Sequence, residues 1–333
     1  MNKLRIATFN LENLDDKANQ KPTLEERIAL IRPQLYRLDA DILCFQEVNG
    51  QEQEGHPRRL LALQELIKGT QYADYQIVST MTEDGKQVYD ERNLVILSRY
   101  DILEYHQYKH DYAPAPHYLQ VTAKTIGEGE NKSRKVSWER PILYARIKIK
   151  DLTVDIINVH LKSRIPSNIE GQKLNNYTWR TASGFAEGFF ISSMKRVGQA
   201  LETRILIDNL FDEDEDRWIV VCGDFNAELE EVPLAAIRGE VEDTGNSRLA
   251  KRVMVPCELS IPESSRFSLY HRGKGRMLDH FLVSRGMMGC YKGLEVHNEL
   301  LHDESIAFAT ERKFPESDHA PMIVEFELHD GSL

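Results

Sequence analysis

The spacing of hydrophobic and polar residues predicts that strands and helices alternate along the chain. Short apolar runs bounded by polar residues are typical of strands. They occupy residues 4–10, 41–48, 93–99, 141–149, 153–161, 218–226, 278–284 and 321–328. Apolar residues three or four positions apart predict helices over 23–39, 60–67 and 185–211.

Two of the expected helices carry further signals. Thr23 and Glu26 have the spacing of a capping box, which predicts where the first helix begins, and Pro33 is expected to kink it. The helix over 185–211 is expected to be the longest and to bury one stripe of side chains. That stripe comprises Phe190, Met194, Val197, Leu201 and Ile205.

The order of these elements indicates the architecture. Strand pairs occur both with and without an intervening helix, which favours an α/β fold with mixed sheets inside and helices outside. No internal repeat, proline-rich linker or low-complexity tract divides the chain, so we expect a single domain over 1–333. The polar stretches 106–138 and 162–184 are expected to be long surface loops, which commonly carry function.

Composition narrows the class of protein. With 41% hydrophobic and 29% charged residues, the chain has the composition of a globular protein, and no apolar run is long enough to cross a membrane. The N-terminus lacks the features of a signal peptide, which favours a cytoplasmic location. We expect neither a membrane nor an obligate protein as a partner. Cys44, Cys222, Cys257 and Cys290 form no CxxC pair and are expected to be buried thiols.

The net charge bears on the choice of partner. A formal charge of −11 argues against a large non-specific grip on nucleic acid, because that affinity comes mostly from Lys and Arg on phosphates. The distribution of charge modifies this conclusion, since basic residues gather at 131–135 and 271–276. A site rich in Asp and Glu also lowers the total charge without repelling phosphate once a cation is bound.

Candidate chemistry gathers where the apolar runs end or begin. The polar residues there are Asn10, Glu47, His160, Asp224, Asn226, Asp279, Asp318 and His319. Any one of them could be a cap or a turn residue. Together they indicate a site at one edge of a sheet, where rigid scaffolds present reactive groups.

Three of these residues suit a metal ion. Asn10, Glu47 and Asp318 offer hard oxygen ligands, which favour Mg²⁺ or Mn²⁺ over Zn²⁺. A cation held there would neutralise negative charge on a phosphate and stabilise its leaving oxygen. The sequence therefore predicts a divalent-metal site.

The remaining residues predict attack by water on a phosphate. Asp224 and His319 can activate a water molecule, and Asn226 and His160 can donate hydrogen bonds to the phosphate oxygens. Serine and cysteine nucleophile motifs such as G-x-S-x-G are absent from the sequence. Water is therefore the expected nucleophile.

Six short motifs support this interpretation. FN, QE, HLKS, GDFN, LDH and SDH follow one another between Leu4 and Leu328. In this order they resemble the endonuclease/exonuclease/phosphatase superfamily, which includes pancreatic-type deoxyribonuclease and bacterial metal-dependent nucleases. The resemblance implies a four-layer α/β/β/α sandwich of two mixed β-sheets with outer helices, and a phosphohydrolase that uses Mg²⁺ or Mn²⁺.

The resemblance also implies roles for the metal and the water. Glu47 matches the principal metal ligand, with Asn10 beside it and Asp318 as a further ligand. Asp224 matches the acid that activates the water. Its neighbour Asn226 matches the residue that contacts the phosphate.

Further roles follow from the deoxyribonuclease-like branch. His319 matches the catalytic imidazole, with Asp279 as its orienting partner. His160 matches the second histidine, which is paired in that branch with a glutamate, and Glu91 takes that place here. Arg140 matches an arginine that binds the substrate phosphate.

The chain departs from the family pattern in two ways. His280 stands where many relatives carry Tyr, although LDH is common in bacterial secreted nucleases of this superfamily. Those relatives are usually exported, so the absent export signal leaves the biological substrate open. Lys162 lies either near the phosphate path or simply in solvent, and Tyr177 and Trp179 either stack on bases or pack their loop down.

Three hypotheses about function follow. The first is a Mg²⁺- or Mn²⁺-dependent nuclease that acts on DNA or RNA. The second keeps the chemistry but takes a small phosphorylated substrate such as an inositol phosphate, a nucleotide or sphingomyelin, which the acidic net charge favours. The third is a catalytically inactive binding module, which the complete set of site residues opposes.

Overall fold

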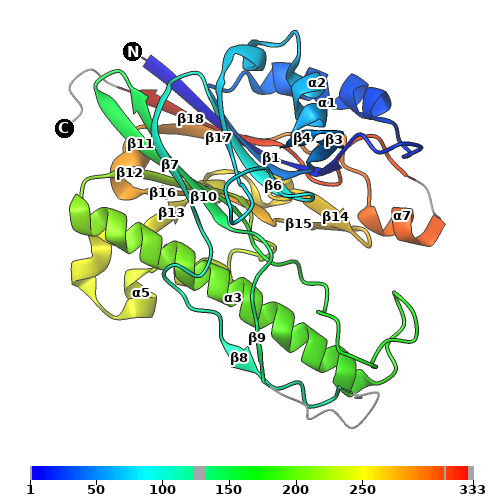
Figure 1. The fold of residues 1–333 in the computed structure, drawn as a ribbon. Helices are drawn as coiled ribbons and strands as arrows, with labels where there is room; N and C mark the ends of the chain where they lie inside the picture. Colours follow the sequence, from blue (N-terminus) through cyan, green and yellow to red (C-terminus); the bar gives the residue numbers. More distant parts are fainter. Residues whose placement is uncertain (1, 124–132, 311–312, 329–333) are drawn as a thin grey trace.

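The protein is an α/β sandwich of four layers, shown in Figure 1. The computed structural model describes residues 2–123, 133–310 and 313–328. Two six-stranded mixed sheets pack face to face, and helices cover their outer faces. This arrangement confirms the fold class predicted from the sequence. Residues 124–132, which belong to the first predicted loop, lie outside the described residues.

The first sheet contains the first and last strands of the chain. In spatial order its strands are β17 (Tyr291–Val296), β18 (Met322–Leu328), β1 (Asn2–Leu14), β2 (Ile42–Val48), β6 (Asn93–Ser98) and β5 (Gln76–Ser79). Strands β1 and β2 run parallel, and the other neighbours run antiparallel. A parallel pair needs a crossover connection, which helix α1 (Leu24–Leu38) supplies.

The second sheet repeats this plan. Its strands are β13 (Met254–Pro256), β16 (Asp279–Ser284), β12 (Trp218–Asp224), β11 (Leu152–His160), β10 (Ile142–Ile149) and β7 (Asp101–Tyr108). Strands β11 and β12 form the parallel pair, and helix α3 (Ala182–Glu213) connects them. In both sheets, therefore, two neighbouring strands end at the same edge.

Apolar clusters hold the four layers together. Successive residues of a strand point to opposite faces, so Ile156 lies in the core between the sheets while Ile157 faces the outer helices. On the outer face of the first sheet, α1 and α2 (Leu61–Ile67) bury Leu35 and Leu66. On the outer face of the second sheet, α3 and α4 (Val232–Arg238) bury apolar residues in the same way.

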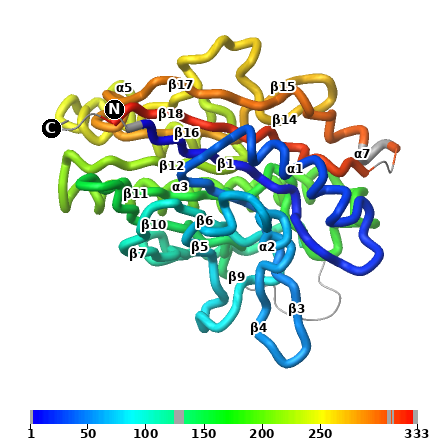
Figure 2. The backbone as a smooth tube through the Cα atoms, turned by 90° about the horizontal axis from the view of Figure 1, so that it is seen from above, coloured from blue at the N-terminus to red at the C-terminus, as the bar shows by residue number. Residues whose placement is uncertain are grey.

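Smaller elements lie around the sandwich. They are the strand pairs β3 (Gln51–Gln53) with β4 (His56–Arg59), β8 (His117–Tyr118) with β9 (Arg134–Lys135) and β14 (Leu269–His271) with β15 (Lys274–Arg276), and the helices α5 (Val241–Thr244), α6 (Arg285–Met288) and α7 (Glu304–Thr310). Figure 2 shows the β3–β4 pair projecting away from the two sheets. The β8–β9 pair lies beside α3 in Figure 1, at the edge of a cavity that Arg134, Lys162 and Lys195 also line.

The start of α1 confirms the predicted capping box. Thr23 Oγ1 accepts a hydrogen bond of 3.2 Å from the Glu26 amide, and the Glu26 carboxylate accepts one of 2.7 Å from the Thr23 amide. These bonds satisfy two backbone donors that lack a partner within the helix. The helix continues through Pro33 to Leu38.

The prediction of which stripe of side chains α3 buries is wrong. Phe190 and Leu201 are 49% and 50% exposed. The apolar residues that the helix buries are Ile191, Ala200, Leu206, Ile207 and Leu210. This face also buries polar residues, because hydrogen bonds satisfy them: Gln199 donates to the Arg140 carbonyl at 3.2 Å, and Glu202 accepts from the Asp111 amide at 2.7 Å. Apolar spacing alone therefore selects the wrong side of this helix.

The cysteines behave as predicted. All four are free and buried, and Cys44 and Cys222 lie in the core between the sheets. Burial raises the pKa of the Cys44 thiol well above its usual value. Separately, the helices in the described parts of the chain include none with the length and apolarity needed to cross a membrane.

Candidate active site

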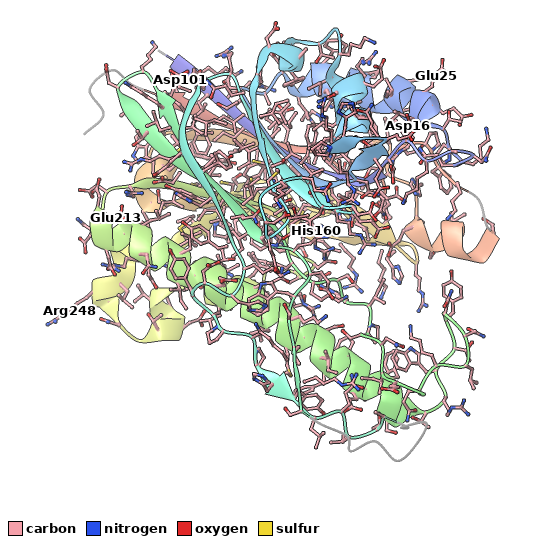
Figure 3. The ribbon with its side chains drawn as sticks, in the orientation of Figure 1. Asp16, Glu25, Asp101, His160, Glu213 and Arg248 are labelled. Atoms are coloured by element: carbon pink, nitrogen blue, oxygen red, sulfur yellow. The ribbon has the colours of Figure 1, made fainter. Side chains whose placement is uncertain are left out.

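Strand register places three of the predicted residues in one row across the second sheet. His160 ends β11 and is paired with Asp224 at the end of β12. Asp224 is in turn paired with Asp279, at the start of β16. All three are buried, and Figure 3 shows His160 near the centre of the molecule. The sheet itself therefore fixes how these side chains are spaced.

Glu47 reaches these residues from the first sheet because β2 bulges at that point. Its φ of +58° lies in the left-handed region, and the pairing of β2 with β6 shifts register between Phe45 and Val48. A bulge of this kind re-aims a side chain. As a result, Glu47 Oε1 lies 3.5 Å from His160 Nε2, on the other sheet.

Asp224 is at the centre of a hydrogen-bond network. Its Oδ2 accepts bonds from Asn10 Nδ2 at 3.1 Å and from Asn226 Nδ2 at 3.0 Å, and it lies 3.2 Å from His160 Nε2. Burial alone would raise the pKa of Asp224, but His160 and His319 outweigh it and hold that pKa well below the usual value. The Asp224 carboxylate is therefore ionised across the neutral pH range.

His160 itself is neutral. Burial, helped by the nearby Arg140 guanidinium, lowers the pKa of His160 although Asp224 and Glu47 oppose this effect. Because Nε2 faces two carboxylates, the neutral ring carries its proton on Nε2. Its Nδ1 atom is buried and has no hydrogen-bond partner among the described residues.

His319 and Asp279 form the closest acid–imidazole pair of the site. Asp279 Oδ2 lies 2.7 Å from His319 Nδ1, and His319 Nε2 lies 4.0 Å from Asp224 Oδ2. Burial would lower the pKa of His319, but the Asp279 and Asp224 carboxylates raise it well above the usual value. His319 is thus an imidazolium at neutral pH, with Nδ1 bonded and Nε2 directed toward Asp224.

Three carboxylates gather beside this pair, and one of them was missed by the sequence analysis. The carboxylate of Glu12 accepts a hydrogen bond of 3.1 Å from the Asp318 amide. Burial raises the pKa of Asp318 well above its usual value, and repulsion from Glu12 and Glu47 raises it further. Burial also raises the pKa of Glu12. Strand spacing gave no signal for Glu12, because it lies beyond the strand predicted over 4–10, where the backbone takes a φ of +45° and β1 shifts its register with β2.

This carboxylate cluster has the chemistry of a site for a hard divalent cation. Asn10, Glu47 and Asp318, the predicted metal ligands, offer oxygens there, and Glu12 adds a further carboxylate. Asp318 Oδ1 has no hydrogen-bond partner among the described atoms. A bound cation would use that oxygen and relieve the mutual repulsion of the carboxylates.

Among the described residues, metal-binding geometry itself is found in a different group. The ligand atoms of Asp224, Asp279 and His319 lie within 4.8 Å of one another. In this group, however, His319 Nδ1 is already bonded to Asp279, and the imidazole is positively charged. Its chemistry therefore suits proton transfer better than metal binding.

Arg140 lies in the site, although two of its donors are used by the backbone. It is 7% exposed, and it donates to the carbonyls of His160 and Leu161, each at 3.1 Å. Its side chain also lines the cavity that contains Asp224 and His319. Arg140 thus fixes the end of β11 in addition to any contact with a phosphate.

Glu91 is not brought to His160, so the pairing implied by the resemblance is not seen here. The side chain is 57% exposed, and its ion pair in the described structure is with Lys17, at 3.7 Å. Glu91 belongs to a polar turn just before β6, which places its carboxylate at the surface. The His160 ring is instead positioned by Asp224 and Glu47.

Part of the site lines one cavity of about 640 Å³. Glu47, His160, Asp224, Asn226 and His319 all line it. The cavity also contains five arginines, Arg92, Arg140, Arg164, Arg272 and Arg276. Two of them come from the basic run at 271–276, while Arg92 and Arg164 carried no signal in the sequence. The cavity therefore has a basic wall although the chain as a whole is acidic.

The polar loop over 162–184 and the start of α3 contribute apolar groups to the same region. Ile165 and Phe185 line the cavity and are 65% and 46% exposed. Trp179 packs edge-on against Phe185, with ring centroids 5.9 Å apart, whereas Tyr177 is 81% exposed. The structure thus separates the two predicted aromatic residues, since Trp179 packs its loop down and Tyr177 faces solvent.

Known structures share this fold at low sequence identity. The mannosyl-6-phosphatase of Bacteroides thetaiotaomicron is 17% identical over 98% of this chain and 100% of its own, with a TM-score of 0.58. A humanized D. rerio TDP2 is 15% identical over 98% and 99%, with a TM-score of 0.57. The 3′ phosphatase NExo of Neisseria is 18% identical over 98% and 100%, with a TM-score of 0.53.

The sequence comparisons identify the family. A search of curated proteins found no match to this sequence. The model of the Endonuclease/Exonuclease/phosphatase family, in contrast, matches residues 7–319, a range that includes every predicted site residue. The chain therefore belongs to the Endonuclease/Exonuclease/phosphatase family, whose members are divalent-metal-dependent phosphoric ester hydrolases.

Proposed function

We propose that this protein is a divalent-metal-dependent phosphodiesterase that cleaves DNA or RNA. One observation carries the proposal: Glu47 of the carboxylate cluster, together with Asp224 and His319 of the Asp224–His319–Asp279 network, lines a single cavity whose wall contains five arginines. The first two features suit hydrolysis of a phosphate ester. The arginines suit a substrate with several negative charges, because a guanidinium donates charge-assisted hydrogen bonds to phosphate oxygens.

In this proposal Glu47, Asp318 and Asn10 hold Mg²⁺ or Mn²⁺, with Glu12 beside them. The cation would neutralise charge on the phosphate and stabilise the leaving oxygen. Arg27 stabilises the backbone that carries Glu12, because it donates to the carbonyls of Leu11 and Glu12 at 2.6 and 3.0 Å.

The protonation states suggest how the other residues act. Asp224, being ionised, accepts a hydrogen bond from the attacking water and thereby orients the water oxygen toward phosphorus. In the complex with substrate, neutral His160 and Asn226 would turn N–H groups from their present partners, which include Asp224 and the Leu161 carbonyl, to the phosphate oxygens, which gain negative charge as the bond to water forms. His319, held in place by Asp279, is a protonated donor on the other side of Asp224 and can supply a proton as the ester bond breaks.

A structural relative supports nucleic acid as the substrate. The Neisseria 3′ phosphatase NExo, which has this fold, is described as bound to a product DNA hairpin. Together with the basic wall of the cavity, this favours a nucleic acid strand over an isolated phosphate.

The experiment is digestion of a plasmid and of a single-stranded oligonucleotide with Mg²⁺ or Mn²⁺. The wild type should cleave at least one, and His319→Ala and Glu47→Gln should each lower kcat/KM by about 10²-fold or more. His56→Ala, a change of an exposed histidine on β4, is the matched control. If both nucleic acids stay intact with either metal, the proposal is wrong.

A small phosphorylated substrate is the second candidate. The mannosyl-6-phosphatase of Bacteroides thetaiotaomicron has the same fold, and the net charge of −11 suits a substrate that needs few basic contacts. Release of free phosphate from sugar, inositol and nucleotide monoesters distinguishes the two, since a diesterase releases none from them.

A further inference from the structure

A second cavity, of about 480 Å³, lies next to the active-site cavity. It is formed between the β8–β9 pair and the first half of α3 (Figure 1). Among the described residues, the charged side chains that line it are Arg134, Lys135, Lys162, Lys195 and one carboxylate, Glu139. Four cations face one anion, so the lining is strongly basic.

The two cavities share a wall. Lys162, Ser167 and Asn168 line the second cavity, and the residues between them, 163–166, line the first. Arg140 of the first cavity and Glu139 of the second are likewise adjacent in the chain. A ligand that extends beyond the first cavity is therefore within reach of the second.

Lys162 lies at this shared wall. It follows the site residue His160 by two positions, and its Nζ lies 2.9 Å from Ser163 Oγ and 3.3 Å from the Ile165 carbonyl. Burial lowers the pKa of Lys162 to about 8; Glu139 opposes this effect, while Arg140, Lys195 and Arg196 add to it. The positive charge around Lys162 is thus only partly compensated by the protein.

The carboxylates of this region do not balance its cations. Glu139, the one acid among the described lining residues, is bonded to Lys195 at 2.5 Å. Arg134 and Lys135 are exposed on β9, and Glu170 lies 3.5 Å from Arg134 at the surface. Concave clusters of basic side chains attract anions, and burial of the amine strengthens the attraction.

We propose that this second cavity binds a phosphate group of the substrate other than the one that is hydrolysed. The inference rests on the proposed function and deepens it, because it requires a substrate with at least two phosphates. In a nucleic acid strand the second group is a neighbouring phosphodiester. A small molecule with two phosphates has the same chemistry, and the experiments below separate these sources.

The first experiment compares cleavage of a dinucleoside monophosphate with cleavage of the same molecule phosphorylated at its 5′ or 3′ end. The wild type should prefer one phosphorylated form by about tenfold in kcat/KM. Arg134→Gln/Lys135→Gln, which alters exposed side chains only, should reduce that preference to less than threefold, and Lys162→Met should reduce it further. Lys68→Gln/Lys86→Gln, a double change of exposed lysines elsewhere, should leave the preference intact.

The second experiment measures binding without catalysis. A fluorescent single-stranded oligonucleotide is titrated with the protein in EDTA at several salt concentrations. For every phosphate that a variant no longer neutralises, the slope of log K against log salt should decrease in magnitude by about 0.7. We expect this decrease in Arg134→Gln/Lys135→Gln and an unchanged slope in Lys68→Gln/Lys86→Gln.

These outcomes separate the two proposals. Cleavage by the wild type with no change in preference or slope in the cavity variants overturns the second phosphate site alone. A reduced slope without any cleavage overturns the proposed function and supports the site. If only a small bisphosphate is hydrolysed, and faster than the monophosphate, the second phosphate comes from a small molecule rather than from a strand.

Discussion

Asn158 and Gln46 join the two sheets directly beneath the active site. Asn158, on β11, accepts a hydrogen bond of 2.7 Å from Gln46 Nε2, on β2. The side-chain amide of Asn158 donates to the carbonyls of Phe45 and Val95, each at 3.0 Å. These two carbonyls lie where the pairing of β2 with β6 shifts register. One buried side chain therefore satisfies the bulge that aims Glu47 into the cavity. It also fixes how the two halves of the site are placed.

Replacement of Asn158 should destabilise the protein and weaken the site together. In Asn158→Ala, two buried carbonyls lose the Asn158 amide and the Gln46 amide loses one of its partners, which together cost about 3 kcal/mol in free energy of unfolding. We propose that residues 1–333 form one domain, because the core between the sheets takes side chains from both. The variant should therefore unfold in a single urea transition with a lower midpoint than the wild type. Asn176→Ala, at an exposed position in the 162–184 loop, should leave the midpoint unchanged. Equal midpoints for both variants would contradict the role of this bridge.

The carboxylate cluster predicts effects of opposite sign on stability and on metal binding. Asp318→Asn removes one of three mutually repelling acids, so in EDTA its melting temperature should exceed that of the wild type. The same change removes a metal ligand, so the dissociation constant for Mn²⁺ should rise at least tenfold. Thermal unfolding with and without Mn²⁺ measures both effects, because a ligand that binds the folded state more tightly raises its stability by more.

Glu12→Gln should behave like Asp318→Asn in this assay. Asp151→Asn, at an exposed turn between β10 and β11, is the control and should change neither quantity. A loss of stability in EDTA for both cluster variants would show that repulsion among these acids is not significant.

The sequence predicts this site well wherever regular strands carry it. His160, Asp224 and Asp279 lie at strand ends, and pairing in a sheet places such positions in register, so their proximity follows from the order of strands. Glu47 is different: its orientation depends on a bulge with positive φ, which no residue type at that position indicates.

What the sequence could not predict depends on contacts between distant segments. Glu12 lies beyond the predicted strand over 4–10, and its carboxylate joins the site only because the loop with Asp318 folds over it. The buried face of α3 could not be predicted from apolar spacing, because Gln199 and Glu202 are buried by bonds to remote backbone atoms. Glu91 was assigned by position in a motif, and its turn directs the side chain outward.

Asp279 should control the charge of His319. With the neighbouring carboxylate neutralised in Asp279→Asn, the pKa of His319 should fall toward or below its ordinary value, because burial then dominates. NMR titration of the imidazole in metal-free protein measures this shift directly. We expect kcat to fall by about 10²-fold at neutral pH, since the protonated donor is lost. Asp243→Asn, at an exposed position on α5, should change neither quantity.

The buried pair of His280 and Glu258 predicts a specific pH dependence of stability. Glu258 Oε1 lies 2.5 Å from His280 Nδ1, both side chains are fully buried, and His280 Nε2 donates to the Ala227 carbonyl at 2.8 Å. Burial would lower the pKa of His280, but Glu258 raises it above the usual value of about 6.5. The pair's contribution to folding is therefore complete below about pH 6.5, and it is lost as the pH rises through the higher pKa of the folded state.

Glu258→Gln tests this dependence. Breaking a buried pair typically costs about 3 kcal/mol, so the variant should be less stable than the wild type by about that amount at pH 6. The difference should shrink at higher pH, because the wild type alone loses the ionic contribution. Urea unfolding between pH 6 and 9 measures it, with Glu263→Gln at an exposed position as the control. A difference that stays constant over this range would mean that His280 carries no charge in the folded protein.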